Sequence, residues 1–265
     1  MDKYNSRKRF IKICYSMVLL SLSIFLHFNQ GLFLFQRNLT FKFKDDELID
    51  VYTNIKSHDG KDINLYFHDR NSDIDLIFIH GSRVSGKIYK KILEQIAEKT
   101  NCNVFGFYLR GVNNKRGEPS EKGICIEAKK VGDYIKSRNK KVFIYGQSLG
   151  SSVALSLGIH LRVKDLILEN PFTTFGTIVN YLKFLSYFSY LVVDKWDNIE
   201  KIKRHNGRVL FFISEFDKLV PNEESQTLAN HHENSKIIKL KNSTHFNVQQ
   251  NEMFYEHLND FIYSK

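Results

Sequence analysis

The 265-residue sequence is poor in the residues that build disulfide frameworks, linkers and metal sites. It contains only three prolines and three cysteines, at positions 14, 102 and 125. Three cysteines are too few for a disulfide framework, and we expect all three to be free. No segment is rich in proline, glycine and serine, so no linker divides the chain. Neither C-x-x-C nor H-E-x-x-H occurs, so we predict no metal site and no cofactor.

A dense basic stripe is also absent, although the net charge is +10. A nucleic-acid-binding protein usually shows such a stripe or a known binding motif. Here the excess of positive charge comes mostly from scattered lysines, which is typical of a solvated surface. We therefore predict no nucleic-acid partner.

One long apolar stretch is present, near the N-terminus. Residues 13–28 are mostly apolar, Asn29 and Gln30 interrupt the run, and residues 31–35 resume it. Residues 13–35 together exceed the ~20 residues that a membrane-spanning helix needs. The nearest small-x-small pattern, at residues 21–23, lies inside the run rather than at its end, which favours a transmembrane signal anchor over a cleaved signal peptide.

The tail before this stretch, residues 1–12, is basic and contains Lys3, Arg7, Lys8, Arg9 and Lys12. Basic residues beside a membrane span tend to stay on the cytosolic side. We expect a single-pass membrane protein with a cytosolic N-terminus. Its domain, residues 36–265, then lies on the lumenal or extracellular side, and an endomembrane such as the endoplasmic reticulum is the expected location.

Residues 36–265 alternate between apolar runs typical of strands and amphipathic stretches typical of helices. Residues 49–57 and 63–67 predict a β-hairpin around a turn at 58–61. The further predicted strands are 76–79, 103–108, 141–145, 165–168, 208–213 and 236–240. The predicted helices are 88–99, 123–137, 151–157, 223–230 and 252–262. An antiparallel start followed by β–α alternation predicts an α/β fold with a doubly wound, mostly parallel sheet.

The motif Gly146-Gln147-Ser148-Leu149-Gly150 has the form G-x-S-x-G. By itself this pattern also fits a helix start with small residues. Here a predicted strand precedes it and a predicted helix follows it, which is the context of a nucleophile elbow. We therefore predict that Ser148 is a catalytic nucleophile.

A serine nucleophile needs a base to take its proton, and the base needs an acid to orient it. Around a nucleophile elbow these residues follow in the order serine, acid, histidine. We choose Asp217, after the predicted strand 208–213, as the acid; Glu215 is the rival but stands nearer the strand end. His245 is the predicted base, because among ten histidines it alone directly follows the final predicted strand.

Two backbone amides are expected to form the oxyanion hole that such a reaction requires. One is the amide of Leu149, directly after the nucleophile. The other is the amide of Ser82, in a loop where Gly81 allows a sharp turn after the predicted strand 76–79. We expect His80 to be a structural residue of this turn.

Several motifs of the chain together match those of one known family. They are Phe78-Ile79-His80-Gly81, Tyr108-Leu109-Arg110-Gly111, Gly117-Glu118-Pro119-Ser120-Glu121-Lys122-Gly123, Gly146 to Gly150, Glu169-Asn170-Pro171-Phe172-Thr173, Lys195-Trp196, Asp217 to Pro221 and Thr244-His245. The combination resembles the membrane-anchored bud-emergence family of α/β-hydrolases, which is related to protein depalmitoylases and serine peptidases. The resemblance implies an α/β-hydrolase fold, a serine hydrolase activity and a single N-terminal anchor.

The sequence departs from the family pattern at three places. Ser151 follows Gly150 where a second glycine is frequent, and Ser82 stands where asparagine is frequent. Asn242 and Ser243 precede Thr244 where glycine is usual. None of these changes removes a member of the predicted triad.

An insertion of about residues 171–205 is expected to form a small cap above the site. Its aromatic residues are Phe175, Tyr181, Phe184, Tyr187, Phe188, Tyr190 and Trp196. An aromatic cap suits an acyl chain or a lipid, although ordinary packing of a helical cap explains any one of these residues at least as well. The leading hypothesis is an ester or thioester hydrolase acting on acyl, lipid or acyl-protein substrates. A serine peptidase and a non-catalytic, membrane-tethered interaction protein are the alternatives.

Overall fold

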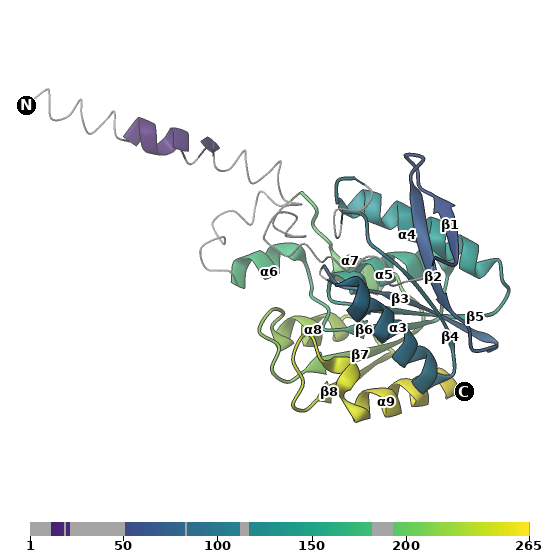
Figure 1. Cartoon of the computed structure of the whole chain (residues 1–265). Coiled ribbons are helices and arrows are strands. Elements are labelled where there is room, and N and C mark those ends of the chain that lie inside the picture. The colour runs from purple at the N-terminus through teal and green to yellow at the C-terminus, as the bar shows by residue number, and fades with distance from the viewer. Residues whose placement is uncertain are drawn as a thin grey trace, which may run out of the picture.

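The computed structural model describes residues 12–18, 20–21, 51–82, 84–111, 117–181 and 193–264. Within these residues eight strands form one sheet: β1 (Thr53–Lys56), β2 (Asp62–His68), β3 (Ile74–Ile79), β4 (Asn103–Phe107), β5 (Lys141–Gln147), β6 (Asp165–Glu169), β7 (Arg208–Ser214) and β8 (Ser235–Leu240). The strand order is β1-β2-β4-β3-β5-β6-β7-β8 (Figure 1).

The sheet is antiparallel at one end and parallel through the rest. β1 pairs with β2 and β2 pairs with β4 in antiparallel register, whereas every pair from β4 to β8 is parallel. The predicted hairpin is therefore present and continues the main sheet. The carboxyl ends of β5, β6, β7 and β8 meet at one edge, where the predicted site residues follow them.

Helices cover both faces of the sheet (Figure 1). They are α3 (Gly86–Thr100), α4 (Glu121–Lys136), α5 (Leu149–Leu161), α6 (Phe175–Tyr181), α7 (Asn198–Lys203), α8 (Asn222–Ala229), the 3₁₀ helix η3 (Val248–Gln250) and α9 (Glu252–Tyr263). Residues of α4, α5, α7 and α8 belong to one buried apolar cluster, and residues of α3, η3 and α9 to another. The predicted doubly wound α/β fold is confirmed.

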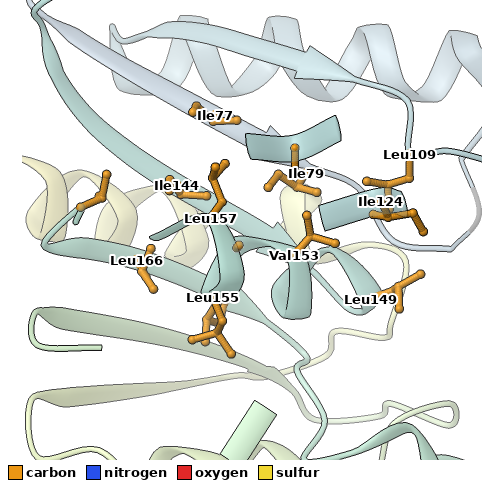
Figure 2. Close-up of a cluster of buried hydrophobic side chains, with 14 of the residues drawn as sticks. Ile77, Ile79, Leu109, Ile124, Ile144, Leu149, Val153, Leu155, Leu157 and Leu166 are labelled. Atoms are coloured by element: carbon orange, nitrogen blue, oxygen red, sulfur yellow. The ribbon is translucent and has the colours of Figure 1, made fainter. Parts of the chain in front are cut away.

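The central strands are apolar on both faces because both faces are covered. Along β5, Val142 and Ile144 pack with the first cluster, and Phe143 and Tyr145 pack with the second. Figure 2 shows the first cluster, in which strand residues such as Ile144 lie against side chains of α5 such as Val153 and Leu157. β5 is thus packed on both faces directly before α5 begins.

Side-chain caps explain why two helices begin earlier than their apolar patterns predicted. The Ser85 side chain accepts a hydrogen bond from the amide of Ile88, and α3 begins at Gly86 rather than at residue 88. The Ser120 side chain accepts one from the amide of Gly123, and α4 begins at Glu121 rather than at residue 123. In both helices the cap accepts a hydrogen bond from an amide of the first turn. The apolar periodicity does not predict this contact, so it placed both helix starts too late.

The predicted cap segment contains α6 and α7, and residues 182–192 lie outside the described residues. Of its aromatic side chains, Phe175 packs against the first buried cluster and Trp196 is fully buried within it. The amine of Lys201 lies 5.3 Å from the centre of the Trp196 ring. Trp196 is thus a packing residue and presents no surface to a ligand. Phe184, Tyr187, Phe188 and Tyr190 lie outside the described residues.

Most of the predicted anchor, residues 13–35, and most of the basic tail lie outside the described residues. Residues 12–18 and 20–21 are helical. Within the described ranges, no helix combines the length and apolar character needed to span a bilayer. All three cysteines are free, as predicted.

Candidate active site

Ser148 lies at a sharp turn between β5 and α5. Its backbone has φ 52° and ψ −117°, a conformation that costs energy for a residue with a side chain. Two glycines make the turn possible. A Cβ atom at Gly146 would lie 2.4 Å from the carbonyl oxygen of Gly150, and one at Gly150 would lie 2.1 Å from that of Ile79. Neither position can hold a larger residue without moving backbone, and the geometry is that of a nucleophile elbow.

Ser151 stands at the position where the family frequently has a second glycine, and its side chain stabilises the elbow. Its side chain is fully buried, and its hydroxyl donates to the carbonyl oxygen of Gly146 at 2.7 Å. The amide of Ser148 donates to the carbonyl oxygen of Glu169 on β6 at 2.8 Å. The strained turn is therefore fixed to two neighbouring strands.

The predicted oxyanion loop lies directly beside the elbow. A Cβ atom built on Gly81 would be 3.3 Å from the Cβ of Ser148, which places the loop after β3 against the nucleophile. Leu149 is the first residue of α5, where amide hydrogens have no partner within the helix. Ser82 follows Gly81 and is half-buried.

His80 holds this loop in place. It is fully buried, and its Nε2 accepts a hydrogen bond from the amide of Leu109 at 3.1 Å. Its Nδ1 lies 2.5 Å from the carbonyl oxygen of Gly81, so Nδ1 carries the proton and donates it. Both ring nitrogens bind backbone, in accord with the structural role expected for His80.

Asp217 and His245, 28 residues apart in sequence, form a hydrogen-bonded pair. The distance from His245 Nδ1 to Asp217 Oδ2 is 2.6 Å, and the two side chains are 9% and 1% exposed. The other carboxylate oxygen of Asp217 accepts from the amides of Leu219 at 2.8 Å and Val220 at 2.9 Å. The carboxylate is thus fixed before it meets the ring, and Nε2 is left as the ring nitrogen that can exchange a proton.

Glu215, the rival acid, has a different partner. Its Oε2 accepts from the amide of Asn242 at 2.8 Å, and its side chain is exposed. This bond fastens the β7 loop to the β8 loop. Glu215 therefore stabilises the loop that carries His245 and does not orient the His245 ring.

Asn170 and Ser214 form a second support, which the sequence does not predict. The Asn170 side chain accepts from the Ser214 amide at 2.8 Å and donates to its hydroxyl at 2.9 Å. That hydroxyl donates to the carbonyl oxygen of Thr244, next to His245, at 3.0 Å. Asn170 stands in a motif quoted above, but the motif does not predict its partner Ser214 on β7 or the further hydrogen bond from Ser214 to Thr244.

The carboxyl group of Glu169 is also enclosed beside the site, although the sequence predicts no role for it. It is fully buried, with Tyr145, Gln147 and Gln249 as hydrogen-bond donors. Burial raises the pKa of Glu169 to about 7, although the hydrogen bonds from Tyr145 and Gln147 act in the opposite direction.

Ser148 follows β5 and His245 comes in the loop after β8, at the same edge of the sheet, with β6 and β7 between those two strands. Among the described residues, no hydrogen bond joins the Ser148 hydroxyl to the His245 ring. Catalytic hydrogen bonds of this kind are often long without substrate and shorten when it binds. The structure thus pairs the predicted acid and base, and it places the predicted nucleophile beside the predicted oxyanion loop.

A separate cluster joins the hairpin to α4. Potential ligand atoms of His58, Asp59 and Glu127 lie within 4.8 Å of one another. Arg110 binds both carboxylates, at 2.7 Å to Asp59 and 2.9 Å to Glu127. Its hydrogen bond holds the pKa of Asp59 below the ordinary value. We interpret the cluster as an ion-pair network, which explains why the Tyr108 to Gly111 motif contains an arginine.

Comparison with characterised proteins identifies relatives in three kingdoms. Protein bem46 of Schizosaccharomyces pombe is 28% identical over 191 residues, 67% of this chain and 59% of its own. Lysophosphatidylserine lipase ABHD12 of Gallus gallus is 30% identical over 189 residues, 63% of this chain and 49% of its own. The α/β-hydrolase domain-containing protein WAV2 of Arabidopsis thaliana is 30% identical over 143 residues, 47% of this chain and 46% of its own. The chain thus spans about half the length of these relatives.

Solved structures with the same fold include esterases. The Pyrococcus furiosus esterase Pf2001 has a TM-score of 0.64 at 17% identity, over 81% of this chain and 90% of its own. Est1E of Butyrivibrio proteoclasticus, solved with ferulic acid, has a TM-score of 0.65 at 17% identity, over 79% of this chain and 97% of its own. No protein-family profile matches the chain. The resemblance and the α/β-hydrolase fold predicted from the motifs are confirmed.

Proposed function

We propose that this protein is a serine hydrolase in which Ser148, Asp217 and His245 form the catalytic triad. The chain is homologous to α/β-hydrolase-domain proteins and has their fold. The hydrogen-bonded pair of Asp217 and His245, at the sheet edge that also carries the strained Ser148, is the observation that supports it most. The conformation of Ser148 and the burial of Asp217 are costly features that a purely structural loop does not need.

The proposed mechanism begins with attack of the Ser148 hydroxyl on the acyl carbon. His245 Nε2 accepts the hydroxyl proton and later returns it to the leaving group. Asp217, bound to Nδ1, keeps the ring in the tautomer with a free Nε2 and stabilises the imidazolium. The amides of Leu149 and Ser82 stabilise the negative oxygen of the tetrahedral intermediate. A water molecule then attacks the acyl carbon of the acyl-enzyme, with His245 again accepting and returning the proton, and the Ser148 hydroxyl is released.

We assign acyl esters or thioesters, in lipids or acylated proteins, as the substrate class. One relative is named a lipase of lysophosphatidylserine, and structural neighbours are named esterases. A triad of this kind requires no metal or cofactor for acyl transfer. Membrane attachment by residues 13–35 is part of the proposal and rests on the sequence.

A substrate panel tests the assignment. Purified protein is given p-nitrophenyl acyl esters, an acyl thioester and an internally quenched peptide, beside Ser148→Ala as the matched control. We expect turnover of the ester and thioester by the wild type and a loss of about 10⁴-fold or more in kcat for the variant. If the wild type cleaves only the peptide, the substrate class is peptides and not acyl esters or thioesters. Equal rates for wild type and variant would remove Ser148 from the mechanism.

A further inference from the structure

Glu169 occupies an unusual position between the two halves of the proposed triad. It is the last residue of β6, and its neighbours in the sheet are Gln147 on β5 and Phe212 on β7. Its backbone carbonyl accepts from the Ser148 amide at 2.8 Å and from the Ser151 hydroxyl at 3.3 Å. The main chain of Glu169 therefore already supports the nucleophile.

The side chain of Glu169 connects the nucleophile elbow to the histidine loop. Its Oε1 accepts from Nε2 of Gln147, the residue before Ser148, at 2.9 Å. Its Oε2 accepts from Nε2 of Gln249, four residues after His245, at 2.7 Å. Tyr145 donates its hydroxyl to the same Oε2, and Gln249 also donates to that hydroxyl at 2.9 Å.

A carboxyl group suits this position because all of its partners here donate. Two amide groups and one phenol converge on two oxygens, and an apolar side chain would leave these buried donors unsatisfied. An amide in place of the carboxyl would turn an N–H group toward at least one of the donors. Burying a carboxyl group without a full set of hydrogen-bond partners is costly. The complete set of donors around Glu169 therefore indicates that this site is built to hold a carboxyl group.

Charged and titratable groups face Glu169 from every neighbouring element. Tyr145 belongs to β5, Asp217 follows β7, His245 follows β8 and Tyr255 belongs to α9. Burial is the main influence on the pKa of Glu169; His245 lowers this pKa and Asp217 raises it.

We propose that Glu169 is a positioning residue of the hydrolytic reaction: its carboxyl group joins Gln147 to Gln249 and so fixes the distance between Ser148 and His245. The inference rests on the proposed triad and adds a residue outside it. It follows that breaking the bridge alters the alignment of nucleophile and base while leaving the substrate-binding surface in place. A displacement of about 1 Å between such groups costs up to 10²-fold in rate.

Glu169→Gln breaks the bridge with almost no change in volume. We expect kcat for a short water-soluble ester to fall by about tenfold or more, with KM changed less than about twofold. A fall in kcat of the folded variant without a matching change in KM is the readout that a merely structural role would not give. Glu127→Gln is the matched control, because Glu127 is buried and hydrogen-bonded but contacts Ser57 and Arg110 instead.

An exchanged pair provides the decisive variant. In Glu169→Gln combined with Gln249→Glu, the new amide at 169 donates to the new carboxylate at 249, and the hydrogen bond from Gln147 is kept. We expect kcat to recover to within about threefold of the wild type, since the pair re-forms the bridge. If Glu169→Gln does not fold, Gln249→Ala removes one arm of the bridge and carries the same expected loss.

The outcomes separate the two proposals. Full activity of folded Glu169→Gln, or no recovery in the exchanged pair, would overturn the positioning role and leave the triad untouched. A wild type that turns over no ester and reacts with no serine probe would overturn the triad, and the positioning role with it.

Discussion

At the scale of single residues, Asp217 shows how the proposed acid is prepared for its role. Two amides of its own loop hold one oxygen, and the other oxygen meets His245 Nδ1. The carboxylate therefore loses no further freedom when the ring becomes charged, which is the preorganisation that makes such acids effective. Glu215, only two residues away, is committed to the amide of Asn242.

Replacing the two acids separately tests this difference. Asp217→Asn keeps the shape but puts an amide where the ring N–H requires an acceptor, and we expect a loss of about 10³- to 10⁴-fold in kcat. Glu215→Gln keeps a carbonyl oxygen for the Asn242 amide and should retain near-wild-type activity. Ester hydrolysis by both folded variants gives the answer, and a larger loss in Glu215→Gln would show that the acid was wrongly chosen.

Glu169 also predicts a pH dependence of stability. Its pKa is about 7 in the folded protein against an ordinary value of 4.5, because burial disfavours the charged form. The folded state thus holds this proton more tightly, and stability falls as pH rises from about 4 to 7, by about 3 kcal/mol in all. Glu169→Gln lacks this slope, so its free energy of unfolding relative to the wild type should rise over the same interval. Denaturant unfolding at pH 4.5 and pH 8 measures it, and parallel profiles would contradict it.

At the scale of elements, the elbow depends on how closely α5 approaches β3. Gly150→Ala would place a methyl group against the carbonyl oxygens of Ile79 and His80, both backbone atoms that cannot turn aside. We expect a loss of about 3 kcal/mol in stability. Gly176→Ala, in α6, is the control, because its nearest neighbour is the Thr174 hydroxyl at 3.7 Å.

Thermal unfolding distinguishes the two alanine variants. The melting temperature of Gly150→Ala should fall by ~6 °C in a chain of this size, whereas Gly176→Ala should change stability by no more than about 1 kcal/mol. A Gly150→Ala variant as stable as the wild type would mean that α5 can move away from β3 without cost.

The elements were predictable from the sequence because their signals are local. Apolar runs such as residues 141–145 and 208–213 give buried parallel strands, and the expected order of acid and histidine selected Asp217 and His245, which the structure pairs. The supports of the site were not predictable. Glu169 meets Gln249 across 80 residues, and Asn170 meets Ser214 across 44, with no pattern in sequence that links them. The burial of Trp196 likewise depends on tertiary packing.

At the scale of the whole molecule, the parallel sheet gathers every proposed site residue at one edge. Loops after β3, β5, β6, β7 and β8 supply Ser82, Ser148, Asn170, Asp217 and His245 respectively. Toward the antiparallel end of the sheet, the Arg110 network joins the hairpin turn to α4 through Asp59 and Glu127 and contains no proposed catalytic residue.

The proposed membrane attachment is a property of the whole chain. Residues 13–35 would form a helix ~35 Å long, enough for a hydrocarbon core of ~30 Å. With basic residues before it, the domain should lie outside the cytosol. We expect the full-length protein to stay in the pellet after alkaline carbonate extraction of microsomes, with its domain protected from added protease. A shortened, extractable product would indicate cleavage, and a protease-sensitive domain would indicate the opposite topology.

The central claim is that Ser148 is a nucleophile activated by His245 and Asp217. A fluorophosphonate probe reacts covalently with activated serines and not with ordinary ones, because it requires the base and the oxyanion hole together. The direct measurement is labelling of the folded wild type, followed by mass spectrometry of the modified peptide. The account predicts one labelled serine, Ser148, with labelling lost in Ser148→Ala and strongly slowed in His245→Ala. Absence of labelling in the folded wild type, or labelling at another serine, would contradict it.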